Sequence, residues 1–100
     1  MYTVCKNKTE AKKIATMLLK LKLIACANYW PAESVYRWQN KIVNGREVVL
    51  ILKTRKNYYK KIEGLIKKMH SDETPCLLKI MPAQVEPDYL AWLKRETRII

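Results

Sequence analysis

Residues 23–55 read LIACANYWPAESVYRWQNKIVNGREVVLILKTR, and this stretch decides the fold. It contains two long apolar runs, Ile24–Tyr36 and Ile42–Leu52, which are rich in β-branched and aromatic residues. Only a few polar residues separate the two runs, an arrangement that predicts a long antiparallel hairpin. Because a helical pattern stands on either side, the stretch predicts a strand-rich hairpin at the centre of a small α+β domain.

Two alternative turns could join the strands of this hairpin. Asn44-Gly45 is the stronger short-range turn signal, but a turn there leaves most of the first run without a partner. A turn at Gln39-Asn40 pairs both runs along their length, and Asn40 tolerates a positive φ. We therefore predict the turn at Gln39-Asn40 and interpret Gly45 as a β-bulge. Pro31 lacks an N–H group, so it predicts a bulge or an edge position for the first strand.

Shorter patterns on both sides of the hairpin complete the order of elements. Tyr2–Cys5 is an apolar run that predicts a first strand, and helical periodicity follows over Ala11–Leu21 and again over Tyr58–Met69. Cys76–Met81 predicts a buried strand and Tyr89–Thr97 a terminal helix. This order predicts the α+β, ferredoxin-like βαββαβ fold, with an antiparallel sheet and an extra C-terminal helix. A single domain over residues 1–100 suits a chain of 100 residues.

The charge balance is the strongest compositional signal. The chain has 20 Lys and Arg against 9 Asp and Glu, a formal net charge of +11, which makes a nucleic-acid or acidic-membrane partner worth considering. Most of the lysines fall on the polar faces of the two predicted helices, where solvation explains them. No zinc finger, basic zipper or RNP-type motif accompanies them. We therefore keep a basic nucleic-acid-binding module only as the alternative function and do not expect a nucleic-acid partner.

Cysteine usage and the lack of catalytic motifs narrow the function further. Cys5, Cys26 and Cys76 are odd in number and widely spaced, so reduced thiols in the cytoplasm fit better than a disulfide framework or a zinc knuckle. No apolar run approaches the ~18–20 residues that span a bilayer, so no membrane partner is expected. The sequence has no nucleophile elbow, phosphate-cradling loop or informative pair of carboxylates. We therefore expect a protein that is not an enzyme.

Six short words occur in register along nearly the whole chain. They are LIACAN (Leu23–Asn28), Tyr36-x-Trp38-x-x-Lys41-Ile42, Glu47-Val48, Ile51-Leu52-Lys53-Thr54-Arg55, His70-x-x-x-x-Pro75 and Asp88-Tyr89-Leu90-x-Trp92-Leu93. In this order and spacing they resemble the CutA divalent-cation-tolerance family. The resemblance implies a ferredoxin-like subunit, a tightly assembled homotrimer and a likeness to the nitrogen-regulatory PII signalling proteins. It also implies binding of copper or other divalent cations, with no established catalytic reaction.

The resemblance also implies metal ligands. Family members with a described copper site use a cysteine in the first strand and a histidine at the end of the second helix. Thr3 occupies that cysteine position and Cys5 lies two residues away, so His70, the only histidine, is the ligand that clearly survives. Cys26, which matches the family's strand cysteine, is the second candidate. The alternatives are a surface histidine near a helix C-terminus and a buried structural thiol at Cys26.

Seven further residues are candidates for a pocket or an interface between subunits. Aromatic side chains with one or two charges are typical of small-molecule pockets and equally typical of oligomer interfaces, so both readings stay open. The hairpin is also longer than the two helices can cover, and its apolar excess needs a partner. The residues are Tyr36, Trp38, Lys41, Glu47, Lys53, Tyr89 and Trp92.

Overall fold

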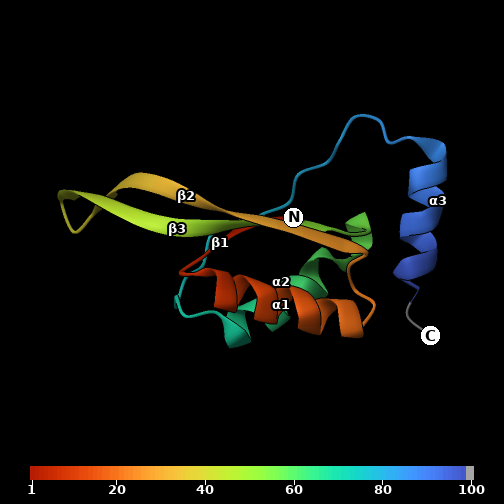
Figure 1. The fold of residues 1–100 in the computed structure, drawn as a ribbon, viewed down its shortest axis with the longest axis horizontal. Coiled ribbons are helices and arrows are strands. Elements are labelled where there is room, and N and C mark those ends of the chain that lie inside the picture. The colour runs from red at the N-terminus through yellow and green to blue at the C-terminus, as the bar shows by residue number, and fades with distance from the viewer. Residues whose placement is uncertain (99–100) are drawn as a thin grey trace.

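A computed structural model describes residues 1–98 and shows a four-stranded antiparallel sheet with two helices on one face and a third helix beyond its end (Figure 1). The strand order is β2-β3-β1-β4, as in the ferredoxin-like fold, so the predicted fold class is confirmed. In chain order the elements are β1 (Tyr2–Cys5), α1 (Lys8–Lys20), β2 (Cys26–Trp38), β3 (Lys41–Lys53), the 3-10 turn η1 (Lys56–Tyr58), α2 (Tyr59–Met69), β4 (Leu77–Leu78) and α3 (Pro87–Glu96).

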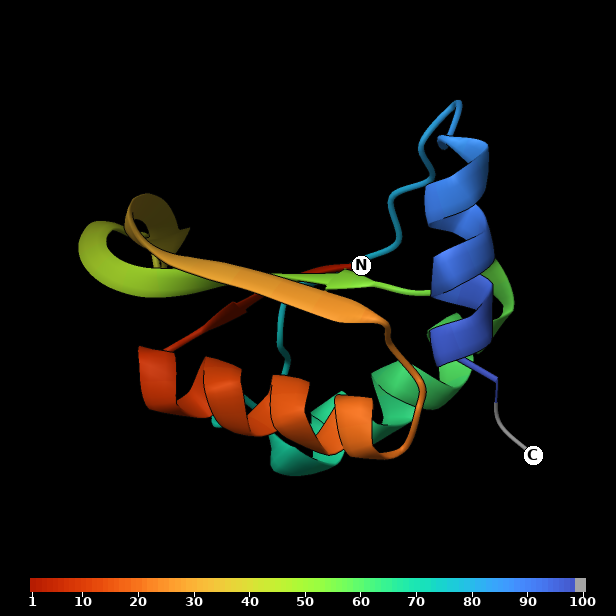
Figure 2. The same ribbon diagram turned by 45° about the vertical axis from the view of Figure 1, so that its right-hand side comes forward.

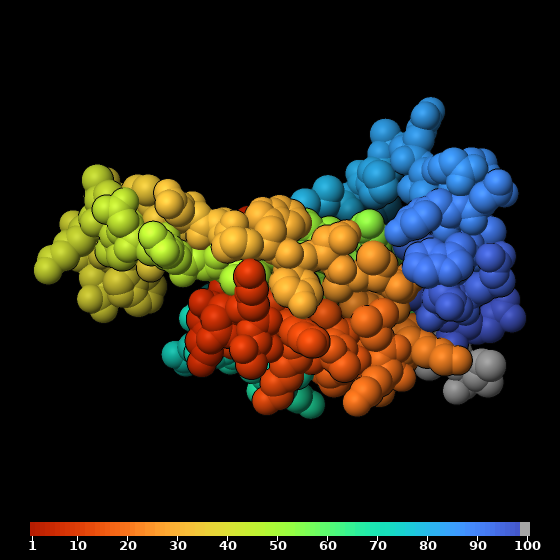
Figure 3. All heavy atoms as spheres, in the orientation of Figure 1, coloured from red at the N-terminus to blue at the C-terminus, as the bar shows by residue number. Residues whose placement is uncertain are grey.

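The β2–β3 hairpin is the longest feature, with 13 residues in each strand. Its far half projects beyond the two helices (Figures 1 and 3). Trp38 pairs with Lys41, which confirms the turn predicted at Gln39-Asn40. Both turn residues have a positive φ, 49° and 62°, as the type I′ turn that matches the natural twist of a hairpin requires.

The hairpin pairing is regular throughout, so the predicted bulge at Gly45 is wrong. Gly45 lies directly opposite Ser34, and no extra residue interrupts the register. A Cβ atom at Gly45 would lie 3.8 Å from Cε1 of Tyr36, so the tyrosine ring packs over the space that the missing side chain leaves. Pro31 sits in β2, which pairs only with β3. The predicted edge position of this proline is therefore confirmed.

The hydrophobic core lies between the sheet and the two helices that cover it, as Figure 2 shows from the side. Each fully buried Leu or Ile side chain in such a core stabilises the fold by about 1.5–3 kcal/mol relative to exposure. Apolar positions three and four residues apart place one stripe of each helix in this core. The buried residues of this core are Cys5, Ala11, Ile14, Ala15, Leu18, Leu23, Ile24, Val48, Leu50, Leu52, Ile62 and Ile66.

The predicted buried strand over Cys76–Met81 is wrong in both length and burial. Only Leu77–Leu78 pair with β1, and Ile80 and Met81 are 60% and 57% exposed. Leu78 already lies opposite Tyr2, the first residue of β1, so the residues after it have no strand to join. The apolar run therefore marks a surface rather than a core strand.

The third helix confirms the predicted terminal helix, with slightly different ends. Pro87 occupies the first turn, and the carboxylate of Glu86 accepts a hydrogen bond from the Tyr89 N–H at 2.8 Å, so the helix starts with a proline and a side-chain cap. In the part of the chain that the structure describes, none of the helices combines the length and apolar character that crossing a membrane takes.

Candidate functional site

A thiol, a carboxylate and an imidazole meet where β1 ends. Cys5 is the last residue of β1, Glu10 lies in the first turn of α1, and His70 follows the last residue of α2. Their candidate ligand atoms all lie within 4.8 Å of one another. Sulfur, nitrogen and oxygen donors are the mixture that zinc and copper accept. We call these three residues the Cys5 cluster.

The His70 imidazole is fixed in this cluster by two hydrogen bonds. Its side chain has no exposed surface. The Nε2 atom lies 2.7 Å from the Val4 carbonyl oxygen, and the Asp72 N–H donates to Nδ1 at 2.9 Å. These partners assign the proton to Nε2 and set the orientation of the ring. The alternative of a surface histidine is therefore wrong, because the extended backbone at His70 turns the ring back towards β1.

Glu10 supplies the carboxylate. Its two oxygens accept hydrogen bonds from the Lys6 N–H and the Ser71 N–H, each at 2.9 Å. Burial acts to raise the pKa of Glu10, but these hydrogen bonds lower it overall. The carboxylate is therefore ionised at neutral pH, and its Oε1 atom lies 4.0 Å from Nε2 of His70.

The Cys5 thiol is buried and protonated. Burial raises its pKa to about 12, and the carboxylates of Glu10 and Asp72 act in the same direction. A metal ion binds the thiolate rather than the thiol. Binding at this cluster would therefore release the thiol proton and become tighter as the pH rises.

Sequence reasoning identified His70 but missed its two companions. Glu10 looks like an ordinary acid in the first turn of a helix, and Cys5 was considered only as a neighbour of Thr3. One sequence signal could have found both residues. The first predicted strand ends at Cys5 and the helix begins soon after it, so this short connection must hold Cys5 and Glu10 near each other.

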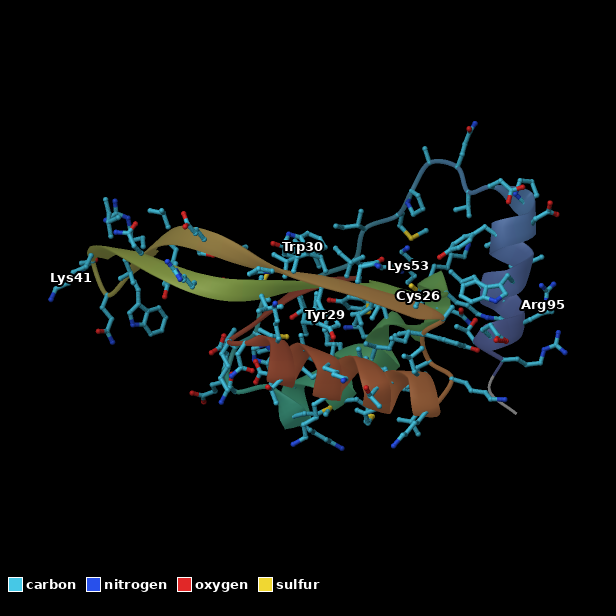
Figure 4. All side chains as sticks on the ribbon, in the orientation of Figure 1. Cys26, Tyr29, Trp30, Lys41, Lys53 and Arg95 are labelled. Carbon is cyan, nitrogen blue, oxygen red and sulfur yellow. The ribbon has the colours of Figure 1, made fainter. Side chains whose placement is uncertain are left out.

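Cys26 lies on the other face of the sheet. It pairs with Lys53 at the base of the hairpin, and cross-strand partners point to the same face. Lys53 follows Leu52, which is buried against the helices, so Lys53 and Cys26 point away from them (Figure 4). One copy of the chain therefore cannot bring Cys26 and His70 to the same ion. Cys26, which is half-buried, stays a predicted ligand.

The seven predicted pocket or interface residues fall into two groups within one copy. Lys53, Tyr89 and Trp92 lie together, since the Lys53 Nζ is 5.8 Å from the Tyr89 ring centroid and the two aromatic rings are 5.5 Å apart. The others follow the hairpin outward, where the carboxylate of Glu47 accepts a hydrogen bond from the Ser34 hydroxyl at 3.1 Å. By register, this second group lies on the same face of the hairpin as Lys53. Its members are Tyr36, Trp38, Lys41 and Glu47.

That face of the sheet carries no helix, yet it is apolar. Trp30 pairs with Val49, and Tyr2 pairs with both Ile51 and Leu78. Trp30 is 46% exposed and Leu78 is 49% exposed. An antiparallel sheet covered on one side usually shows polar residues on its open side. We call this surface, formed by Tyr2, Trp30, Val49, Ile51 and Leu78, the helix-free face.

Comparison with known proteins gives consistent matches over nearly the full chain. The family model described as CutA1 divalent ion tolerance protein matches residues 1–96. The divalent-cation tolerance protein CutA of Pyrococcus horikoshii is 38% identical over 98 residues, covering 98% of this chain and 96% of the relative. The same protein of Archaeoglobus fulgidus is 34% identical, covering 93% of this chain and 91% of the relative.

Solved structures match equally well. The crystal structure of CutA1 from Pyrococcus horikoshii has a TM-score of 0.93 and 37% identity, covering 97% of this chain and 95% of that chain. The structure of the periplasmic divalent cation tolerance protein CutA from Archaeoglobus fulgidus has a TM-score of 0.95 and 33% identity, with the same two coverages.

Proposed function

This chain belongs to the CutA1 divalent ion tolerance family, and from that premise we propose that it is a non-enzymatic protein that binds a divalent cation through Cys5, Glu10 and His70. The observation that carries the proposal is the approach of these three donors to within 4.8 Å of one another. The family takes its name from tolerance of divalent ions, not from a reaction.

The donor set fits a borderline or soft cation. Magnesium and calcium take oxygen ligands, whereas imidazole and thiolate favour copper and zinc. Once the Cys5 thiol has lost its proton, the thiolate and the Glu10 carboxylate supply two negative charges that offset the charge of a divalent ion in a poorly solvated site. To bind an ion, His70 Nε2 would give up its proton and its contact with the Val4 carbonyl oxygen. The proton would move to Nδ1, so the hydrogen bond from the Asp72 N–H to Nδ1 would also have to break.

Calorimetric titration with zinc or copper tests this proposal. We expect Cys5→Ser and His70→Ala each to weaken binding by at least about tenfold. Loss of a residue that only hydrogen-bonds to a metal ligand already has an effect of that size. Cys76→Ser, the same chemical change at an exposed thiol outside the cluster, should bind as the wild type does. Wild-type affinity in both cluster variants would overturn the proposal. Circular dichroism of each variant separates lost binding from lost folding.

We also propose that copies of the chain assemble through the helix-free face into a homotrimer. An exposed apolar surface of this kind marks an association site, and closed symmetric assembly covers it in every copy. The number three comes from the resemblance to the CutA family. Cys26 lies beside this face, so any ion that it binds would need ligands from another copy.

Two further proposals concern cellular context. The three free cysteines support a reducing compartment, and we propose the cytoplasm. The Archaeoglobus fulgidus relative is named a periplasmic protein, and the location proposed for the present chain is based on its cysteines alone. A signalling role like that of the PII proteins stays a prediction that follows from the family resemblance.

A further inference from the structure

The two helices that cover the sheet present a basic surface to solvent. They lie side by side on one face of the sheet (Figures 1 and 2). Residues seven apart in a helix point to nearly the same side, because seven residues make almost two turns. Three pairs of exposed lysines have this spacing and lie on the side away from the buried stripe of their helix. We call these residues the lysine face, and they are Lys13 and Lys20 of α1 and Lys60, Lys67, Lys61 and Lys68 of α2.

The acidic residues of the chain lie mostly outside these helices. Only two of the nine, Glu10 and Glu63, belong to α1 and α2. The Glu10 carboxylate accepts hydrogen bonds from the Lys6 and Ser71 N–H groups, and Glu63 lies 3.7 Å from the Lys60 Nζ. Within residues 1–98, Lys60 is the only member of the lysine face in an ion pair. The other five ammonium groups therefore have no counter-charge from the protein.

Gly64 lies in the middle of the α2 part of the lysine face, between two lysines on either side along the chain. It is exposed, and a Cβ atom there would meet no other atom within 4 Å. Packing within one copy of the chain therefore does not require a glycine here, although glycine destabilises a helix relative to alanine. A helix backbone without a side chain between four lysines allows a charged ligand to approach closely.

The other exposed side chains of these helices narrow the class of ligand. Within the described ranges of α1 and α2, no exposed residue is aromatic, Arg, Asn or Gln. Proteins bind single strands by stacking bases on aromatic rings, and they read bases in a duplex mainly with Arg, Asn and Gln. Lysines remain, and they bind the phosphate backbone of a duplex whatever its sequence.

A membrane surface fits this face less well than a duplex does. A helix that lies on a membrane buries an apolar face among the lipids. The apolar stripes of α1 and α2 are already buried in the core, and Leu19 is the one exposed apolar side chain within the described ranges of the two helices. A single leucine provides little apolar surface for a membrane to bury.

We propose that the lysine face binds the phosphate backbone of double-stranded nucleic acid without sequence preference. The charges of one lysine pair are roughly 10 Å apart along the helix, and a duplex carries about six phosphates over that length. From the sequence, solvation was the simpler explanation of these lysines, because the sequence does not show that both helices present them on one side of the sheet. The helix-free face lies on the opposite side of the sheet, so assembly through it leaves the lysine face uncovered.

Fluorescence anisotropy with a short labelled DNA duplex tests the proposal on the assembled wild-type protein, with EDTA present so that no metal ion bridges the two. We expect binding at low salt, with equal affinity for two duplexes of unrelated sequence and weaker binding to a single strand. If six phosphates are contacted, the affinity should fall about a thousandfold between about 50 and about 200 mM salt.

Two double variants separate the lysine face from the net charge. Lys61→Gln/Lys68→Gln should weaken duplex binding at least about tenfold and reduce the slope of log affinity against log salt by about two. The control Lys41→Gln/Lys79→Gln removes the same charge at exposed positions outside both helices. It should keep the wild-type slope, because charges more than about 10 Å away are largely screened at moderate salt. All four lysines are exposed, so both variants should keep the circular dichroism of the wild type.

Several outcomes would overturn the proposal. They are no duplex binding by the wild type at low salt, equal losses of affinity in the two double variants, tighter binding to the single strand, or binding to phosphatidylserine vesicles without binding to the duplex. Zinc affinity should be unchanged in both double variants, so failure of this proposal is distinguishable from failure of the proposed metal site.

Discussion

Glu10 connects three parts of the chain through one carboxylate. It accepts hydrogen bonds from the residue after β1 and from the loop that follows α2, while its own N–H donates to the Asn7 side chain that caps α1. The same carboxylate lies 4.0 Å from His70. Local folding contacts therefore position this ligand atom before any ion arrives.

The hydrogen bonds to Glu10 predict a specific loss of stability in acid. Because folding lowers its pKa below the ordinary value of 4.5, the unfolded state binds more protons in acid. The contribution of Glu10 to stability is complete above that value and disappears as the pH falls through the folded-state pKa. Glu10→Gln should lower the free energy of unfolding at pH 7 by about 1–2 kcal/mol. It should also make the free energy of unfolding fall less steeply as the pH is lowered into the acid range.

Urea unfolding over a series of pH values measures this effect. Glu33→Gln is the matched control, because Glu33 is exposed in the hairpin. This variant should leave the acid dependence of the free energy of unfolding unchanged. If the free energy of unfolding of Glu10→Gln falls in acid as steeply as that of the wild type, the protons taken up on unfolding bind to other carboxylates.

For single residues, the sequence indicated which side chain could bind a metal ion better than it indicated whether that side chain is buried. His70 stood out because it is the only histidine, yet its burial depends on a hydrogen bond to Val4, which lies 66 positions away in the chain. Cys5 and Glu10 have ordinary local roles, in a strand and in a helix turn. Only the tertiary fold brings His70 to them.

At the scale of elements, the hairpin turn offers a direct test of backbone strain. Gln39 and Asn40 both have a positive φ, and Asn-Gly is the preferred pair for a type I′ turn. Gln39→Asn/Asn40→Gly should raise the free energy of unfolding by about 0.5–1 kcal/mol, because it relieves left-handed strain. Asn40→Val should lower it by about 1 kcal/mol or more, since a β-branched residue resists this conformation. Equal stability of the two variants in thermal unfolding would contradict the account.

The long elements were predictable because their patterns repeat. The hairpin could be predicted by asking which turn pairs both apolar runs along their length. The two long helices could be predicted because their apolar residues recur every three or four positions. The prediction for the run Cys76–Met81 was wrong, because an apolar segment can lie on the surface of one copy of the chain as well as fill its core. Its pairing is limited by the four residues of β1, a limit that becomes visible only once the sheet is assembled.

On the scale of the whole molecule, the sheet separates two surfaces. The Cys5 cluster lies at the end of β1 on the helix side, and the apolar surface lies on the helix-free side. The order of elements and the family resemblance were available from the sequence. The meeting of Cys5, Glu10 and His70 was not, because it depends on contacts between residues that lie far apart in the sequence.

The helix-free face predicts assembly. Sedimentation velocity should give three times the mass of one chain, and Trp30→Glu should shift the protein towards smaller species, because it places a charge on the apolar surface. Lys12→Glu on the exposed side of α1 is the control and should keep the wild-type mass. A wild-type mass equal to one chain at all concentrations would contradict the proposal.

X-ray absorption spectroscopy of the zinc-loaded protein tests the central claim, a cation held by the Cys5 cluster, most directly. We predict one sulfur ligand at about 2.3 Å together with nitrogen or oxygen ligands at about 2.0–2.2 Å. The sulfur signal should disappear in Cys5→Ser and persist in Cys26→Ser. A shell of oxygen and nitrogen alone in the wild type, or a sulfur signal that survives in Cys5→Ser, would contradict the claim.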